Sequence, residues 1–292
     1  ISTKYLYMKR IIVPIDFSNE AMEGLQLAVT LSQKIPSTIE MVYVQKNKNE
    51  FYHITQEREH ELAEKKFNNI LDTYRDKIPE HSELRYIIKK GKIYQEVVNQ
   101  AHSFDDSLIV SSTHGASGFE RFFLGSNTFK IITATDRPVF TIRDTISPKT
   151  IKNIILPIDT SHDTRQKLPF TTEVARFFDA KVHVLSVCQT LTKEFKKRLE
   201  TYSRQACEYL EKHEIHYTKE GRSGKNITDM TLEYAKEVKA DLISIMTEQS
   251  LAFSGVVLGG NAQDMLNKSD YPVLSITPKE LYIGGNFKTQ GY

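Results

Sequence analysis

Residues 10–16 read Arg-Ile-Ile-Val-Pro-Ile-Asp, and residues 153–159 read Asn-Ile-Ile-Leu-Pro-Ile-Asp. Each stretch is a short run of apolar, mostly β-branched residues that ends in Pro-Ile-Asp. Such a run is typical of a strand that is buried on both faces of a parallel sheet. The two prolines, Pro14 and Pro157, are 143 residues apart, so the same strand is predicted twice in one chain.

Two further matches follow later in each half of the chain. Residues 124–127 (Leu-Gly-Ser-Asn) match 258–261 (Leu-Gly-Gly-Asn), and residues 136–142 match 270–276 around a shared Asp-x-Pro-Val. Both pairs are 134 residues apart, which means that the second copy is shorter in its middle. Three matches in the same order predict a duplicated unit of about 140 residues, the size of an ordinary domain.

Within the first copy, strand and helix patterns alternate. Ser18 is a predicted N-cap, and Met22, Leu25, Val29 and Ser32 follow it at helical spacing. A long charged helix is predicted over 53–76, with an inner stripe made of Leu62, Phe67, Ile70, Leu71 and Tyr74. Further helices are predicted after Gly91 and from about Ser126. The predicted strands are 10–15, 39–44, 85–89, 107–111 and 138–142.

The second copy repeats this order, with strands predicted near 153–158, 182–187, 215–219, 241–246 and 272–276. Alternation of strand and helix indicates an α/β fold. We therefore expect two tandem doubly wound, Rossmann-like domains, each with a five-stranded, mostly parallel sheet flanked by helices. The polar stretch 144–150 carries Pro148 and is a natural linker, so the domains are expected to be 1–146 and 147–292.

The composition is that of an ordinary globular protein. Of the 292 residues 39% are apolar and 26% are charged, and the formal net charge is +2. No basic cluster indicates nucleic acid, and no apolar run is long enough for a membrane span. Two cysteines, Cys188 and Cys207, fit a reducing compartment. With no secretory signal before Met8, we expect a cytoplasmic protein with neither a membrane nor a nucleic-acid partner.

Ligands of open parallel sheets bind beyond the carboxyl ends of the strands. That rule selects the end of the first strand, Pro14-Ile15-Asp16, and the loop 111–127 after the fourth strand. Gly125 and Ser126 open a helix there, and a helix start offers free N–H groups to phosphate. Other interpretations remain: the same glycines suit any strand-to-helix turn, Ser126 suits a helix cap, and Asp16 suits a plain turn residue.

The motifs resemble those of the universal stress protein family. Its first strand ends in Pro-x-Asp-Phe-Ser, which residues 14–18 match. Its ATP-binding members carry Gly, two residues, Gly, nine residues, then Gly followed by Ser or Thr. This chain has Ser112, two residues, Gly115, nine residues, then Gly125-Ser126. The spacing and the later glycines match, whereas Ser112 replaces the first glycine and puts close approach of a ligand there in doubt.

The resemblance implies an ATP site, with or without Mg²⁺, in the first copy. Asp16, beside Pro14, and the backbone of Val44 would meet the adenine and ribose. The phosphates would be lined by Ser112, His114, Gly115, Gly125, Ser126 and Asn127. In the second copy Asp159 is retained, but Glu248 stands at the position of His114 and Gln249 at that of Gly115. A carboxylate repels phosphate, so this second site is expected to be degenerate for ATP.

No set of nucleophile, base and acid is evident, so no catalytic residue is assigned and hydrolysis is expected to be slow at most. The histidines and cysteines match no zinc-ligand spacing, and we expect no structural metal. The expected function is an adenine-nucleotide-binding stress-response module with an unidentified protein partner. The alternatives are an interaction scaffold that binds no nucleotide and an enzyme of the adenine-nucleotide α-hydrolase type. The last strands of the two copies are expected to pair as an internal pseudo-dimer, which leaves room for a homodimer.

Overall fold

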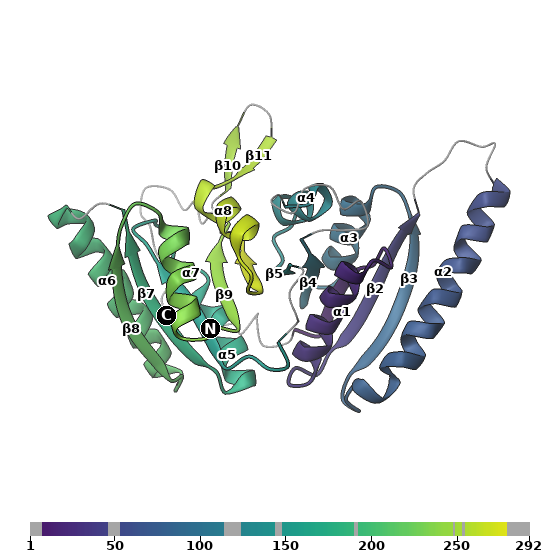
Figure 1. Ribbon diagram of the computed structural model, residues 1–292, viewed down its shortest axis with the longest axis horizontal. Coiled ribbons are helices and arrows are strands. Elements are labelled where there is room, and N and C mark those ends of the chain that lie inside the picture. Colours follow the sequence, from purple (N-terminus) through teal and green to yellow (C-terminus); the bar gives the residue numbers. More distant parts are fainter. Residues whose placement is uncertain are drawn as a thin grey trace.

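The protein consists of two α/β halves around one sheet (Figure 1). The computed structural model describes residues 8–45, 53–113, 124–143, 148–189, 192–247, 249–252 and 255–278. The elements of the first copy are β1 (Arg10–Pro14), α1 (Asn19–Ser32), β2 (Thr38–Gln45), α2 (His53–Tyr74), the 3₁₀ helix η2 (Arg75–Lys77), β3 (Glu83–Lys90), α3 (Ile93–His102), β4 (Ser107–Ser112), α4 (Ser126–Ala134) and β5 (Val139–Ile142).

The second copy follows the same order and adds a hairpin. Its elements are β6 (Asn153–Ile158), α5 (Leu168–Phe178), β7 (Lys181–Cys188), α6 (Lys193–Lys212), β8 (Tyr217–Ser223), α7 (Ile227–Glu237), β9 (Leu242–Met246), β10 (Gln249–Ala252), β11 (Gly255–Leu258), α8 (Gly260–Lys268) and β12 (Val273–Ile276). The antiparallel hairpin β10–β11 was not predicted, because nothing in its apolar and glycine residues distinguishes it from the loop at the same place in the first copy.

Each copy contributes five parallel strands to one ten-stranded sheet, in the order β3-β2-β1-β4-β5-β12-β9-β6-β7-β8. The two copies meet where β5 pairs antiparallel with β12, with Phe140 opposite Leu274. This pairing confirms the predicted internal pseudo-dimer. It also removes the free edge that each short apolar strand would otherwise expose.

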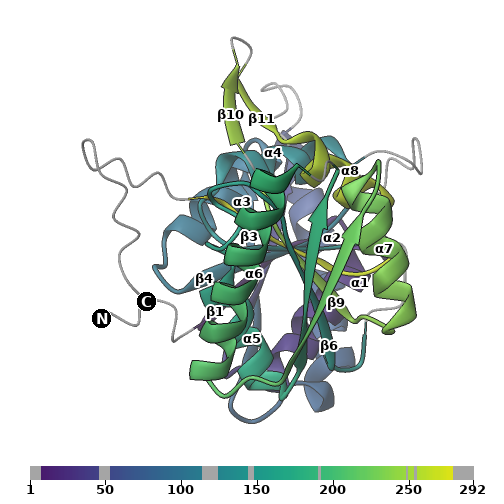
Figure 2. The same ribbon diagram turned by 90° about the vertical axis from the view of Figure 1, so that its left-hand side faces the viewer.

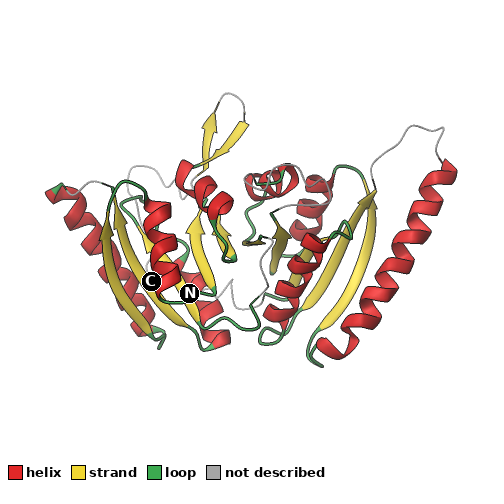
Figure 3. Cartoon of the chain, viewed as in Figure 1, coloured by secondary structure: helices red, strands yellow, loops and turns green. Residues whose placement is uncertain are grey.

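Helices cover both faces of the sheet, as the cartoon in Figure 3 and the turned view in Figure 2 show. Side chains alternate along each strand, so Ile11 and Val13 face one core while Ile12 faces the other. The first core lies under α1, α2, α5 and α6, and the second lies under α3, α4, α7 and α8. The first core crosses the joint between the copies, where the rings of Phe140 and Phe170 are 6.3 Å apart.

The predicted cap of the first helix is confirmed. The Ser18 hydroxyl accepts from the Ala21 amide at the start of α1, as its position predicted. The predicted burial of one residue in the inner stripe of α2 is wrong. Leu62 is 53% exposed, whereas Phe67 is fully buried, because the buried stripe runs through Ala63 and Phe67 at a spacing of four residues.

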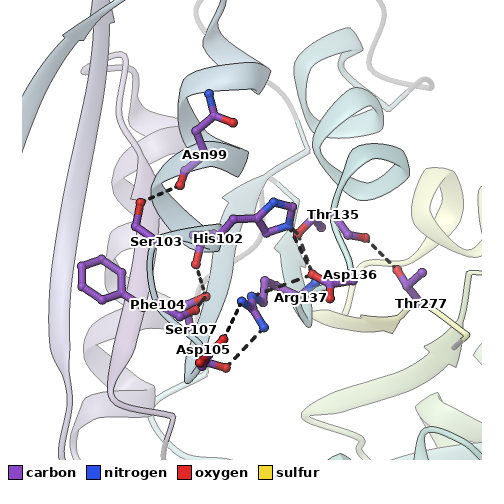
Figure 4. A network of polar contacts seen from close by, with 11 residues as sticks. Asn99, His102, Ser103, Phe104, Asp105, Ser107, Thr135, Asp136, Arg137 and Thr277 are labelled. Atoms are coloured by element: carbon purple, nitrogen blue, oxygen red, sulfur yellow. Dashed lines mark hydrogen bonds and ion pairs between the residues drawn. The ribbon is translucent and has the colours of Figure 1, made fainter.

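Polar contacts connect the segments at the amino ends of the first copy's strands, next to the joint between the copies (Figure 4). His102, at the end of α3, lies 3.2 Å from Asp136, and Arg137 lies 3.6 Å from Asp105. The Thr277 hydroxyl, beyond β12 of the second copy, donates to the Thr135 carbonyl at 3.1 Å. These contacts lie before β4 and β5 begin, at the edge opposite to the predicted nucleotide site.

Candidate functional site

Asp16 lies in a tight turn at the carboxyl end of β1. The Ser18 amide and hydroxyl both donate to Asp16 Oδ1, the former at 3.0 Å. The Asp16 side chain is exposed at this edge. It therefore lies where the carboxyl-end rule predicts a ligand, and one of its oxygens already accepts two hydrogen bonds.

Phe17 shapes this turn. Its φ of 64° lies in the left-handed region, which a bulky residue adopts only when its surroundings hold it there. The Phe17 ring packs 5.1 Å from that of Tyr43 and 4.9 Å from that of Phe67, measured between centroids. Burial of an aromatic ring thus stabilises the backbone that turns Asp16 out of the sheet.

Tyr43 adds a polar anchor beneath the same turn. Its hydroxyl donates to Glu59 of α2 at 2.8 Å. Burial, and after it the hydrogen bond to Glu59, together raise the pKa of Tyr43 to about 12. The phenol therefore stays protonated and keeps donating at neutral pH. The adjacent Val44, predicted to meet the ligand through its backbone, is buried near the end of β2, two residues beyond Val42, which pairs with Pro14 of β1.

The connection from β4 to α4 forms the other wall. The Gly125 amide donates to the Thr113 carbonyl at 2.7 Å, and the Thr128 hydroxyl donates to the Ser112 carbonyl at 2.7 Å. Gly125 is the N-cap of α4, and no side chain caps this helix. Ser126 is the first helical residue rather than the cap, and Ser126 and Asn127 are exposed. An uncapped, exposed helix start leaves N–H donors for an anion.

The structure thus brings seven of the nine predicted residues to one edge of the sheet, because β1 pairs with both β2 and β4. They are Pro14, Asp16 and Val44 on one side and Ser112, Gly125 and Ser126 on the other, with Asn127 following in α4. Ser112 ends β4, and its backbone is not among the left-handed residues of the described chain. His114 and Gly115 lie outside the described residues.

The corresponding edge of the second copy has the same turn. The Ser161 amide and hydroxyl donate to Asp159 Oδ1 at 2.9 and 2.6 Å. The helix α8 also begins at an uncapped glycine, Gly259. Between them lies a pocket of about 40 Å³, which is about the size of one or two water molecules and far below the 300–1,000 Å³ of ordinary ligand sites.

Lys167 is a buried charged side chain at this pocket. It lines the pocket with Asp159 and Met246 and is only 3% exposed. Its ammonium donates to the Thr164 hydroxyl at 3.2 Å, and that hydroxyl in turn accepts from the Asp159 amide. At the 143-residue offset of the first match, the first copy has Gly24 at this position. A Cβ added to Gly24 would lie 3.4 Å from the Ser112 amide nitrogen, so a side chain there would point to the end of β4.

Sequence reasoning missed Lys167. A signal was present in Pro169, which lacks an amide hydrogen and is tolerated in the first turn of a helix. Accordingly α5 begins at Leu168, whereas α1 begins at Asn19, and residues 162–167 form turns. Lys167 therefore precedes its helix, and Gly24 lies inside one.

A larger hollow of about 800 Å³ lies at the opposite edge, between the copies. Its lining includes Ile35, Pro36, His81 and Phe177. The amino ends of β2 and β3 lie there, so the carboxyl-end rule does not select it.

Within the described ranges no group of three or more His, Cys, Asp or Glu side chains is placed to hold a metal ion. The described helices include none long and apolar enough to span a membrane.

The universal stress protein family model matches residues 8–143 and again residues 150–276. This chain belongs to the universal stress protein family. The two matches correspond to the two copies, and they confirm both the resemblance and the tandem arrangement. The chain matches none of the curated proteins.

Solved structures of similar fold span nearly the whole chain. A universal stress protein from Archaeoglobus fulgidus is 17% identical, with a TM-score of 0.75 over 92% of this chain and 98% of its own. A functionally unknown protein from Pseudomonas aeruginosa is 17% identical, with a TM-score of 0.66 over 95% of each chain. A universal stress protein in complex with cAMP matches 44% of this chain at 18% identity and a TM-score of 0.38, too low for any argument about the ligand here. At these identities the likeness shows the fold.

Proposed function

We propose that this universal stress protein binds ATP or a related adenine nucleotide in its first copy and acts as a binding or regulatory module of the stress response. The observation that carries the proposal is the placement of Asp16 and the uncapped start of α4 at the same edge of adjacent strands. A carboxylate suits ribose hydroxyls or an adenine amine, and helix N–H groups suit phosphate. The residues therefore fit a nucleotide, and a bound Mg²⁺ would accompany the phosphates.

The proposal assigns no ligand to the second copy. Its pocket of about 40 Å³ already contains the buried ammonium of Lys167. A nucleotide there would have to displace that side chain and would meet the carboxylate of Glu248. We therefore propose one nucleotide per chain. We propose that any hydrolysis is slow, since the sequence shows no set of nucleophile, base and acid.

Thermal unfolding with and without millimolar Mg-ATP tests the site. A ligand that binds only the folded state at a hundred times its dissociation constant adds about 2.7 kcal/mol to the free energy of unfolding. We expect ATP to raise the midpoint of the wild type but not of Gly115→Arg, whose side chain would fill the loop. Gly221→Arg is the matched control, because a Cβ there meets nothing within 4 Å, and it should shift as the wild type does.

Two results would replace this function. The absence of any shift in the wild type, with AMP, ADP and cAMP as well as ATP, would favour a protein-interaction scaffold that senses no nucleotide. Release of pyrophosphate or AMP would favour an enzyme that acts at the α-phosphate. The protein partner and a homodimer are parts of the proposal that pull-down and sedimentation experiments address separately.

The cellular location belongs to the same proposal. Cys188 and Cys207 are both free and buried, which fits a reducing compartment. We therefore propose that the protein is cytoplasmic. Fractionation of cells that express a tagged full-length chain tests this, and recovery in a secreted or membrane fraction would contradict it.

A further inference from the structure

We propose that Asn267, in the second copy, is a positioning residue for the nucleotide site of the first copy. This inference rests on the proposed function of that site. Asn267 lies near the end of α8, and its side-chain Oδ1 accepts a hydrogen bond from the Leu124 amide at 2.7 Å. Leu124 immediately precedes Gly125, the N-cap of α4. A residue of one domain thus holds the backbone at the predicted phosphate wall of the other.

Hydrogen bonds from the first copy hold both Asn267 and the loop that it contacts. Arg143, which follows β5, donates from its guanidinium to the backbone carbonyl of Asn267. The start of the β4–α4 loop is bonded to the end of β5, because the Thr113 amide donates to the Ile142 carbonyl at 2.8 Å. The Gly125 amide then donates back to the Thr113 carbonyl at 2.7 Å. Both ends of the loop are therefore tied to the joint between the copies, and Asn267 supplies the tie at its far end.

The second copy also packs against the helix itself. β11 contacts α4, and α4 and α8 lie next to each other at the centre of the molecule (Figure 1). An amide in a fixed position costs a ligand less ordering than a mobile one. Holding Leu124 therefore favours the arrangement in which the N–H groups of the first turn of α4 converge on an anion.

The residue at the matched position of the first copy makes a different hydrogen bond. At the 134-residue offset of the later matches, the first copy has Thr133 where the second has Asn267. The Thr133 hydroxyl donates to the Phe129 carbonyl of its own helix at 3.0 Å and so makes a bond within α4. The second copy, with its filled pocket, thus supports the site of the first through a residue that the first copy does not have.

The test compares three variants of the full chain. Asn267→Ala removes the acceptor, Asn267→Asp keeps an acceptor oxygen, and Thr133→Ala is the matched control in the first copy. Two quantities are measured: the dissociation constant of ATP by calorimetry and the hydrogen-exchange rate of the Leu124 amide. Loss of one hydrogen bond corresponds to about a five-fold change in a dissociation constant. We expect Asn267→Ala to weaken ATP binding about five-fold and to speed exchange at Leu124. Asn267→Asp should restore slow exchange at Leu124, and Thr133→Ala should change neither quantity.

The outcomes separate this role from the proposed function. Wild-type ATP affinity in Asn267→Ala overturns the role of Asn267 and leaves the nucleotide site standing. Unchanged exchange at Leu124 overturns the holding contact itself. A wild type that binds no adenine nucleotide removes the proposed function and the role of Asn267 together. Failure of Asn267→Asp to restore slow exchange at Leu124 when Asn267→Ala has lost it would show that packing, and not the accepted hydrogen bond, matters at this position.

Discussion

The two copies carry the same turn at the end of the first strand and differ in what stands beside it. Asp16 and Asp159 each accept from the amide and hydroxyl of a serine two residues later. Both loops end at an uncapped glycine. In the first copy a helix with Gly24 follows the turn, and in the second the buried Lys167 lies there. The same turn motif is therefore followed by different side chains in the two copies.

The difference has a local physical origin. Pro169 lies in the first turn of α5, and residues 162–167 form turns ahead of it. Those turns place Thr164 and Lys167 near Asp159, and the Thr164 hydroxyl accepts from both the Asp159 amide and the Lys167 ammonium. The start of the following helix can thus differ between two copies while the turn before it stays the same.

Transferring the lysine to the first copy should give the largest effect. We expect Gly24→Lys to weaken ATP binding more than about a hundred-fold, equivalent to about 2.7 kcal/mol, because its side chain would lie at the end of β4. Gly24→Ala is the control, since its Cβ would be 3.4 Å from the Ser112 amide, an ordinary contact. Titration calorimetry measures both. Equal affinities for the two variants would show that the long side chain is not what closes a site.

The reverse exchange should open the second copy. A triple variant, Lys167→Gly with Glu248→His and Gln249→Gly, gives the second loop the residues of the first. We expect a second equivalent of ATP to bind, more weakly than the first because Pro169 remains. Calorimetric stoichiometry measures this. A stoichiometry that stays at one would assign the closure of the second site to its backbone instead of these side chains.

The turn at Phe17 should contribute to stability in the first copy only. Phe17→Ala removes a half-buried ring from its cluster, and we expect a loss of about 2 kcal/mol in the free energy of unfolding. Phe17→Gly should lose about 1 kcal/mol less, because glycine adopts the left-handed conformation without strain. Thr160→Ala, the matched position of the second copy, should change the free energy by less than about 0.5 kcal/mol. Denaturant unfolding checks all three, and equal losses at the two turns would contradict the account.

The smallest predicted effect is a pH dependence of the stability that Tyr43 contributes. The folded pKa of Tyr43, about 12, lies above the ordinary value of about 10. Ionisation therefore favours the unfolded chain, so the contribution of the Tyr43 phenol is complete below pH 10 and is lost as the pH rises through 12. The stability difference between wild type and Tyr43→Phe should shrink over that range. Ser186→Ala, at the matched position, should show a constant difference, and a constant difference for Tyr43→Phe would contradict the assignment.

The sequence predicted what depends on local pattern. Alternating apolar runs predicted the strands, and Ser18 predicted the start of α1, because period and capping are properties of neighbouring residues. Leu62 was misplaced, since the choice between adjacent helix faces depends on what packs against them. Lys167 and Asn267 could not be predicted from the motifs, because their roles come from a pocket and a joint that exist only when distant segments meet.

The most direct test of the central claim counts the ATP bound per chain. Calorimetric titration of the wild type should give one equivalent. Gly115→Arg, in the first copy, should abolish binding. Gly260→Arg, in the second copy, should leave it unchanged, because a Cβ at Gly260 meets nothing within 4 Å. Two equivalents, or binding that survives Gly115→Arg and disappears in Gly260→Arg, would contradict the claim that the first copy holds the nucleotide and the second supports it.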